Sequence, residues 1–402
     1  MKFSRKLLNS IGFNRAILAL STARMADAIG NSILFILIPL YVTKIPVKFF
    51  NFSTPVLVGI LISIFGFVSS LTQPVMGAVT DRLGRRKILI QTGLGIIGVC
   101  IVLFIFATHY FDLLILRIIQ GAAVAITIPA SLALMTSITK KETRGGSMGI
   151  YSTFRIVGFS IGPVAGGYLQ ENFGFNTAFY AGAGFILLAI VLVHFWVEEV
   201  RGDVPDSPKR NFKIIDPELI TAGIAATSLA TFLMASAFSM VTTLENEFNS
   251  RLDITAVGFG FAFSTLMIGR LIFQVPLGHY SDKVGRRPLI IIGLIIMGIA
   301  TVLLGEVGSY VQLIILRLVQ GIAAAGIAAP AFAVAADLSK KGGEGRQMSI
   351  VTMGFGFGIA FGPLISGLLA NFFFELPFFV IGILTTSGAW VVYRYLPETV
   401  KE

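Results

Sequence analysis

Long apolar runs alternate with short polar segments along the whole 402-residue chain. A helix of about twenty apolar residues spans the hydrocarbon core of a bilayer. Continuous runs favour helices, because backbone in lipid must bond to itself and barrel strands would show alternation instead. The pattern therefore predicts an all-α integral membrane protein with twelve transmembrane helices. The predicted spans are 15–42, 55–79, 88–108, 113–137, 147–170, 175–197, 217–245, 255–278, 289–308, 312–337, 346–370 and 374–396.

A charged segment between two of these runs occurs twice. The first copy is Gly77-Ala-Val-Thr-Asp81-Arg82-Leu-Gly84-Arg85-Arg86-Lys87, and the second is Gly278-His-Tyr-Ser-Asp282-Lys283-Val-Gly285-Arg286-Arg287. Further pairs keep nearly the same spacing: Arg117 with Arg317, Gln120 with Gln320, Pro129 with Pro330, and Gly162-Pro163 with Gly362-Pro363. A repeated six-span unit keeps its orientation, which predicts two parallel-repeat six-helix halves. The predicted halves are 1–197 and 217–402, joined by a cytoplasmic linker at 198–216.

Basic residues gather in alternate loops. Of the 31 Lys and Arg residues, 23 lie in loops or at span ends on one predicted side, three in loops on the other, and five well inside spans. Cytoplasmic loops carry the excess of positive charge. We therefore expect a multi-pass protein of the cell (inner or plasma) membrane with both termini in the cytoplasm.

Composition narrows the function. Charged residues make up 13% of the chain and hydrophobic residues 55%, whereas soluble proteins carry roughly 25% charged residues. The net charge of +10 is explained by the loops, so we expect no nucleic-acid partner. Cys100 is the only cysteine, which excludes an intramolecular disulfide. The sequence shows no nucleophile–base pair, phosphate loop or metal-ligand cluster, so we expect neither an enzyme nor a bound cofactor or metal.

The chain resembles the major facilitator superfamily over essentially its whole length. The two loop copies are similar to the signature of that superfamily, and Arg117-x-x-Gln-Gly is similar to its second motif. Gly158-x-x-x-Gly162-Pro163-x-x-Gly166 is similar to a motif of the twelve-span drug:proton antiporter branch. The resemblance implies two six-helix halves around a central cavity, alternating access, a proton-coupled cycle and a small-molecule substrate. We expect a monomer in the lipid bilayer.

Asp27 is the first candidate for proton coupling. Arg24, Asp27 and Asn31 share one stripe of the first span, and Asp27 is the only carboxylate well inside a span of the first half. A carboxyl group in such a place can load and release a proton near neutral pH. The alternative is a structural Arg24–Asp27 ion pair that never titrates.

Four more charged residues occupy spans or their ends. Glu245 ends the predicted seventh span and is either a second proton site, an attractor for cationic substrates, or a solvated helix end. The resemblance implies a role for Arg117 in proton transfer or in organising the cavity; alternatively, Arg117 extends to the outer interface. Arg155 and Arg270 lie about two turns from the cytoplasmic end of their spans, where they face the cavity or pair across helices.

The substrate cavity is predicted to involve several of these stripes. Thr231, Met234, Phe238, Thr242 and Glu245 recur at helical spacing, and Gln274 follows Arg270 by one turn. The candidate cavity residues are Asn31, Met234, Phe238, Arg155, Arg270, Gln274 and Arg317. So many arginines inside spans would suit an anionic substrate and stand against a purely cationic one.

Glycines indicate close helix packing. Gly158, Gly162 and Gly166 lie at four-residue spacing, as do Gly358 and Gly362. Rows of small residues let helices approach closely, and Pro163 and Pro363 are expected to bend them. A sharper hypothesis is that these rows form the contact between the halves.

The charged loops are expected to move with the transport cycle. Gly77 and Gly278 permit close approach of helices, and Asp81 and Asp282 are placed to pair with an arginine or a helix N-terminus. The resemblance implies that each loop is a conformational latch made of Gly77, Asp81, Arg82, Gly84 and Arg85 in one copy and of Gly278, Asp282, Gly285 and Arg286 in the other. A simple topology anchor is the alternative.

The predicted function is secondary active transport, with proton-coupled efflux of small amphipathic compounds or drugs as the first hypothesis. The alternative is proton-linked or facilitated transport of a specific metabolite such as a sugar, peptide or organic anion. A transporter-like membrane sensor is a remote third hypothesis.

Overall fold

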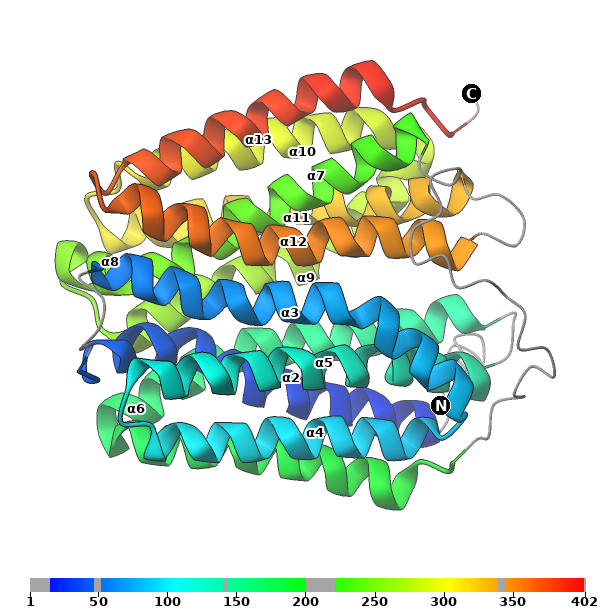
Figure 1. The fold of residues 1–402 in the computed structure, drawn as a ribbon. Helices are drawn as coiled ribbons and strands as arrows, with labels where there is room; N and C mark the ends of the chain where they lie inside the picture. Colours follow the sequence, from blue (N-terminus) through cyan, green and yellow to red (C-terminus); the bar gives the residue numbers. More distant parts are fainter. Residues whose placement is uncertain (1–14, 47–51, 140–142, 200–220, 339–343, 401–402) are drawn as a thin grey trace, which may run out of the picture. The chain divides into compact units, whose positions relative to one another are not determined.

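The computed structural model describes residues 15–46, 52–139, 143–199, 221–338 and 344–400. Helices account for nearly all of this part, and it contains no strand. In chain order the α-helices and 3-10 helices (η) are α2 Arg15–Val42, α3 Thr54–Leu83, α4 Arg86–Leu103, η1 Phe104–Phe106, α5 Tyr110–Ile138, α6 Arg144–Trp196, α7 Ala222–Ser239, η3 Met240–Leu244, α8 Glu245–Leu252, α9 Ala256–Val284, α10 Arg286–Leu304, α11 Tyr310–Asp337, α12 Glu344–Ala370 and α13 Leu376–Tyr395 (Figure 1).

The span count agrees with the sequence. Eleven helical stretches of the described residues are long and apolar enough to cross a membrane. The longest, α6, contains two predicted spans, because Gly174 has a φ of 83° and breaks the helix between them. A residue with a side chain rarely adopts that conformation, whereas glycine does so without penalty. Two spans therefore run through α6, and twelve spans fit the structure.

The seventh span differs from its predicted form. We predicted one helix ending at Glu245, but α7 ends at Ser239, a 3-10 segment follows, and α8 continues to Leu252. Thr221 begins α7 by accepting a hydrogen bond from the Ile224 amide at 3.3 Å. Glu245 is thus the first residue of a further helix. The apolar run hid this change of helical geometry, because length and hydropathy do not report it.

Two compact units emerge from the chain's own contacts. One comprises residues 1–37 and 68–214, and the other comprises residues 38–67 and 215–402. In the first unit α4 packs on α5 and α6; in the second, α10 packs on α11 and α13 in the equivalent way (Figure 1). The division into halves at 197 and 217 stays a prediction, and most of the predicted linker lies outside the described residues.

Glycine rows bring helices together inside each unit. A Cβ on Gly158 would lie 2.7 Å from Ala28 Cβ on α2, and one on Gly162 would lie 2.7 Å from the Ile29 carbonyl oxygen. In the second unit, a Cβ on Gly358 would lie 2.6 Å from Ala235 Cβ on α7. Side chains do not fit at such distances, so these positions require glycine. The rows pack helices within one unit, and their sealing role between the halves stays a prediction.

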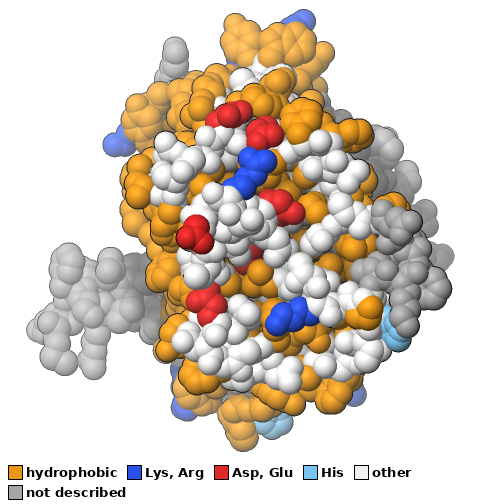
Figure 2. All heavy atoms as spheres, turned by 90° about the vertical axis from the view of Figure 1, so that its left-hand side faces the viewer, with side chains coloured by type: hydrophobic (Ala, Val, Ile, Leu, Met, Phe, Trp, Pro, Cys, Tyr) orange, Lys and Arg blue, Asp and Glu red, His pale blue; other side chains and the backbone are white. Residues whose placement is uncertain are grey.

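Figure 2 views the molecule from the end where α8 lies. Lys and Arg side chains are sparse among the described residues on this face, and apolar side chains surround it. This agrees with the loop charges, which place Lys44 and Arg251 on the predicted outer side. The orientation in the membrane stays a prediction.

Candidate functional site

Asp27 lies in a buried polar stripe on α2. Its side chain forms an ion pair with Arg24, one turn earlier, and the residue is 4% exposed. Asn31 Nδ2, one turn later, donates hydrogen bonds to Asp27 Oδ1 at 2.6 Å and to the Asp27 carbonyl at 3.1 Å. Helical spacing alone places all three side chains together, as the sequence predicted. A buried charge without a partner is costly in a membrane, and here each charge has one.

A narrow cavity reaches this stripe inside the first unit. Its walls come from α2, α4, α5 and α6 and include Arg24, Asp27, Thr127, Ser131 and Tyr151. Tyr151 and Arg155 both interact electrostatically with the pair, Tyr151 with Arg24 and Arg155 with Asp27. Sequence reasoning missed Tyr151, Thr127 and Ser131. The one available signal was that Tyr151 precedes Arg155 by one turn on the same helix face.

Glu245 is buried at the junction of η3 and α8. It is 0% exposed, and neither carboxylate oxygen has a hydrogen-bond partner among the described residues. The charged residue that acts on it electrostatically is Glu247, two positions later. The solvated-helix-end alternative is therefore wrong, because Glu245 is fully buried and α8 continues past it to Leu252. The roles as proton site or cation attractor stay predictions.

Arg117 and Arg317 occupy matching places on α5 and α11. They are 2% and 1% exposed, and the Nη1 of each donates to a glutamine three residues later, at 3.2 Å to Gln120 Oε1 and 2.9 Å to Gln320 Oε1. Arg317 Nη1 also donates to the Phe238 carbonyl at 3.3 Å. The alternative that Arg117 extends to the outer interface is therefore wrong, since its side chain is buried, as is that of Arg317.

Five predicted cavity residues cluster in the second unit. Arg270 on α9 donates from Nε to Gln274 Oε1 at 3.4 Å and lies over the Phe355 ring of α12, 5.9 Å from the centroid. Phe355 in turn packs against Phe238 of α7, with ring centroids 6.0 Å apart. Phe238 carries the carbonyl that Arg317 binds. Met234 lies one turn before Phe238 and is fully buried.

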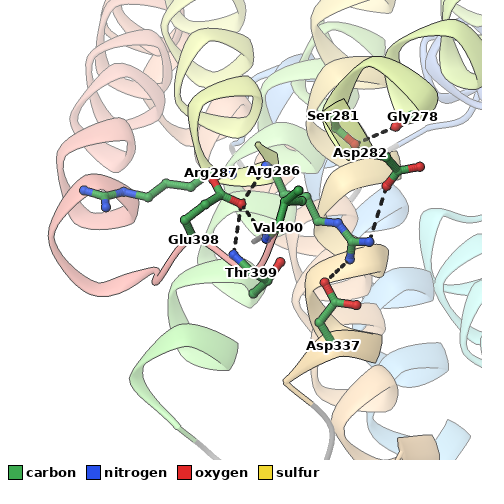
Figure 3. A network of polar contacts seen from close by, with 9 residues as sticks. All are labelled: Gly278, Ser281, Asp282, Arg286, Arg287, Asp337, Glu398, Thr399 and Val400. Atoms are coloured by element: carbon green, nitrogen blue, oxygen red, sulfur yellow. Dashed lines mark hydrogen bonds and ion pairs between the residues drawn. The ribbon is translucent and has the colours of Figure 1, made fainter. Parts of the chain in front are cut away.

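The second charged loop forms a polar network at the start of α10 (Figure 3). Arg286 lies between two carboxylates, an Asp282 oxygen at 3.3 Å and an ion pair with Asp337 at the end of α11. The turn needs Gly285, whose φ is 109°, and Gly84 has a φ of 60° at the same place in the first loop. In the first copy Arg82 and Arg85 are exposed, while the side chain of Asp81 lies outside the described residues.

Each loop receives a carboxylate from the end of its own unit. Glu398 oxygens accept hydrogen bonds from the Arg286 amide at 3.0 Å and the Arg287 amide at 3.1 Å (Figure 3). Glu199 does the same at the start of α4, accepting from the Lys87 amide at 3.2 Å. Carboxylates are stabilising at helix N-termini. Sequence reasoning missed both glutamates; their similar distance behind the loops, 112 residues in each case, was the available signal.

The pKa of Glu398 reflects these hydrogen bonds. Partial burial raises its pKa, but hydrogen bonds from the Val400, Arg286, Arg287 and Thr399 amides lower it, and the net result is a pKa below the ordinary value. The carboxylate is therefore favoured in its charged form, which suits a position beside a helix N-terminus.

The remaining predicted loop glycines are less constrained. A Cβ on Gly77 would lie 3.9 Å from Pro129 Cβ, and one on Gly278 would lie 3.6 Å from Ala329 Cβ. Both are ordinary van der Waals distances. Helix α3 approaches α5 at Gly77, and α9 approaches α11 at Gly278, but the described contacts would admit an alanine at either glycine.

These features define a class of protein: a multi-pass helical membrane protein with a duplicated scaffold and buried, partly paired charges inside its spans, which is the architecture of secondary transporters. The family model of the Major Facilitator Superfamily matches residues 20–249 and 223–402. The chain belongs to the Major Facilitator Superfamily, as the resemblance predicted.

Relatives and solved structures agree with this assignment. The chain is 26% identical over 360 residues to the "Multi-drug resistance efflux pump PmrA homolog" of Lactococcus lactis, covering 86% of each chain. It is 26% identical over 270 residues to "Multidrug resistance protein MdtG" of Escherichia coli, covering 66% of each. A bacterial homologue of the human lysosomal transporter Spinster has the same fold, with a TM-score of 0.78 at 16% identity over 94% of this chain and 96% of that one. The nucleoside transporter NupG gives 0.76 at 13% identity, over 96% and 100%.

Proposed function

We propose that the protein is a proton-coupled efflux transporter for small amphipathic compounds that works by alternating access, in a cell membrane with both termini in the cytoplasm. The similarity to multidrug efflux pumps supports the substrate class. The observation that carries the proton-coupled part is the Arg24–Asp27 pair beside a narrow cavity in the first unit.

In the proposed cycle, Asp27 holds the proton. Protonation of Asp27 removes the charge that neutralises Arg24, so the pair separates and Arg24 must find another partner. Tyr151 is the neighbour that already interacts with Arg24. This change in a buried pair is the local event that couples the proton to movement of the helices, and release of the proton restores the pair.

The loops take the role of latches in this proposal. The Arg286–Asp282 and Arg286–Asp337 contacts and the Glu398 contacts join α9, α10, α11 and the segment after α13. Rearrangement of such a network during the cycle would bias one conformation over another. An Asp81→Asn variant is expected to insert and fold but to transport more slowly than the wild type.

The test of proton coupling uses purified protein in proteoliposomes with an imposed pH gradient. We expect wild-type transport to rise with the gradient, and Asp27→Asn to lose this response while still exchanging substrate for substrate across the membrane. Asp253→Asn is the matched control, because Asp253 is exposed and its left-handed backbone conformation also suits asparagine. Wild-type transport that ignores the pH gradient would contradict antiport; a normal gradient response in Asp27→Asn would contradict the role of Asp27.

The transport of a specific organic anion is the second candidate. Arg270 and Arg317 favour it, because both are buried in the second unit and no carboxylate among the described residues interacts with them. Saturable transport of a single anion, with no competition from unrelated amphipathic compounds, would favour this candidate over broad efflux.

A further inference from the structure

The second unit holds positive charge that the described part of the chain does not neutralise. Arg270 is 8% exposed and Arg317 is 1% exposed. Among the described residues, no carboxylate interacts with either guanidinium, whereas Arg24 in the first unit is paired with Asp27. Charges inside spans mostly pair or face a substrate pathway. A carboxylate partner for these two guanidinium groups is therefore expected from a bound anion.

Arg270 has donors to offer such an anion. Its Nε is directed to Gln274, but Nη1 and Nη2 have no hydrogen-bond partner among the described residues. These two nitrogens are not fully enclosed either, since the enclosed and unpartnered atoms include Nη2 of Arg317 but none of Arg270. Two N–H groups on one edge of a guanidinium match the two oxygens of a carboxylate. Gln274 holds the guanidinium from the opposite edge.

Aromatic rings lie close to the Arg270 guanidinium. The Arg270 guanidinium carbon lies over the Phe355 ring, 5.9 Å from its centroid. The ring centroids of Phe238 and Phe355 are 6.0 Å apart. Arg317 donates a hydrogen bond to the backbone carbonyl of Phe238 at 3.3 Å. The cluster thus combines two packed aromatic rings with two buried positive charges. An anion attached to a flat apolar body fits this combination, and a cation would be repelled by both arginines.

We propose that Arg270 binds the carboxylate of the transported molecule, while Phe355 and Phe238 pack against its apolar body. The substrate class is therefore amphipathic monocarboxylates. This inference rests on the proposed transport function and specifies its substrate. A single guanidinium edge suits a singly charged carboxylate better than a doubly charged phosphate, which would need more donors.

The test is a binding experiment with a matched set of naphthalene probes and the purified full-length protein in lipid nanodiscs. The probes are 2-naphthoate, 2-naphthamide, 2-naphthylmethylamine and 2-naphthyl phosphate. We expect naphthoate to bind at least about tenfold more tightly than the amide or the amine, the factor expected from charge-assisted hydrogen bonds. Equal or tighter binding of the amine, tighter binding of the phosphate, or no saturable binding of naphthoate would overturn the proposal.

Substitutions at Arg270 test whether this residue causes the preference for naphthoate over naphthamide. Arg270→Gln is expected to lower the preference for naphthoate over naphthamide to less than about threefold, while amide binding is unchanged and reports a folded protein. Arg270→Lys keeps the charge but loses the two-donor edge, and is expected to give an intermediate preference. If Arg270→Gln does not fold, the preference of Arg270→Lys for naphthoate over naphthamide decides whether the assignment stands. Arg394→Gln, at an exposed position near the end of α13, is the control and should behave as the wild type. A full preference in both Arg270 variants would refute the assignment.

Transport measurements separate this inference from the proposed function. Gradient-driven transport of amine or amide probes, without any naphthoate preference, would overturn the carboxylate site and leave proton-coupled efflux standing. Arg270-dependent binding of naphthoate, without any response of transport to a pH gradient, would support the site and overturn antiport.

Discussion

The two units use one scaffold but fill it with different chemistry. On α2 a hydroxyl, Ser32 Oγ, donates to the Gly158 carbonyl at 3.4 Å, and on α7 Ser239 Oγ donates to the Gly358 carbonyl at the same distance. Residues of α2 therefore correspond to residues of α7 that lie 207 positions later, while α6 and α12 correspond at 200 positions. This register is a product of the structure, because α2 and α7 share no obvious motif.

The register shows what replaces each polar residue of the first unit. Thr231, Met234 and Phe238 stand where Arg24, Asp27 and Asn31 stand, and Phe355 stands where Arg155 does. Thr231 binds the Val351 carbonyl of α12 at 3.0 Å, whereas Arg24 interacts with Tyr151, the equivalent of Val351. The first unit thus has a stripe with a paired charge, whereas the stripe of the second unit is uncharged and lies near two arginines, Arg270 and Arg317. The proposed roles follow this difference, because the proton is proposed for the first unit and the substrate carboxylate for the second.

Removing one member of the charged pair should have the largest effect. Arg24→Gln leaves Asp27 buried without its partner and is expected to destabilise the protein by about 3–5 kcal/mol at neutral pH. The measurement is thermal unfolding in detergent. The double variant Arg24→Gln/Asp27→Asn has no uncompensated charge and should recover most of the loss. Equal stability of the single and double variants would mean that Arg24 does not stabilise the buried charge of Asp27, and the contrast between the two units would lose its energetic basis.

Moving the acid into the second unit should come next. Met234→Asp places a carboxyl in the equivalent of the Asp27 position, where Thr231 takes the place of the arginine and the site is fully buried. We expect a loss of about 2.5–3.5 kcal/mol. Met234→Leu is the control, because a similar volume should cost less than about 1.5 kcal/mol. If Met234→Asp is stable and restores proton coupling when it is combined with Asp27→Asn, the two units are interchangeable. That result would contradict the difference between them.

The shared scaffold should respond alike in both units. Gly162→Ala and Gly362→Ala each push a Cβ against backbone, at 2.7 Å from the Ile29 carbonyl and 2.5 Å from the Ser236 carbonyl. We expect losses of about 1–3 kcal/mol in each. Gly149→Ala, on the same helix as Gly162, meets nothing within 4 Å and should gain about 0.5–1 kcal/mol from helix propensity. Thermal unfolding tests all three. A tolerated alanine at one of the two packed glycines would show that the scaffold itself is asymmetric.

The smallest effect is expected at the loops. Glu398→Gln removes a carboxylate from the α10 N-terminus, and because Glu398 is exposed we expect a loss below about 1 kcal/mol after solvent screening. Its lowered pKa means that the stabilisation is present above the ordinary value of 4.5 and is lost as pH falls through the lower, folded value. Unfolding followed between neutral and acidic pH should therefore show wild type and variant converging at low pH. Glu199→Gln is the matched variant for the first loop, and a pH-independent difference would argue against the carboxylate as the cause.

The sequence by itself determined the membrane location, the helical class, the duplication and the family. These follow from composition, run length and local motifs, and local properties such as the Arg24–Asp27–Asn31 stripe need only the pitch of one helix. The burial of Glu245 was not accessible in this way. It depends on whether the helix ends there or continues after a 3-10 turn. The inward orientation of Arg117 and Arg317 was equally undecided, since a long side chain near a helix end can point either way.

Only the tertiary structure decided which residues of different helices meet. It brought Tyr151 to Arg24, Phe355 to Arg270, and Glu199 and Glu398 to the helix N-termini behind the two loops. It also set the correspondence between α2 and α7, which made Met234 the counterpart of Asp27. The physical reason is that apolar runs specify helices without specifying their neighbours. The neighbours follow from where glycine rows allow close approach, and that depends on the packing of several helices at once.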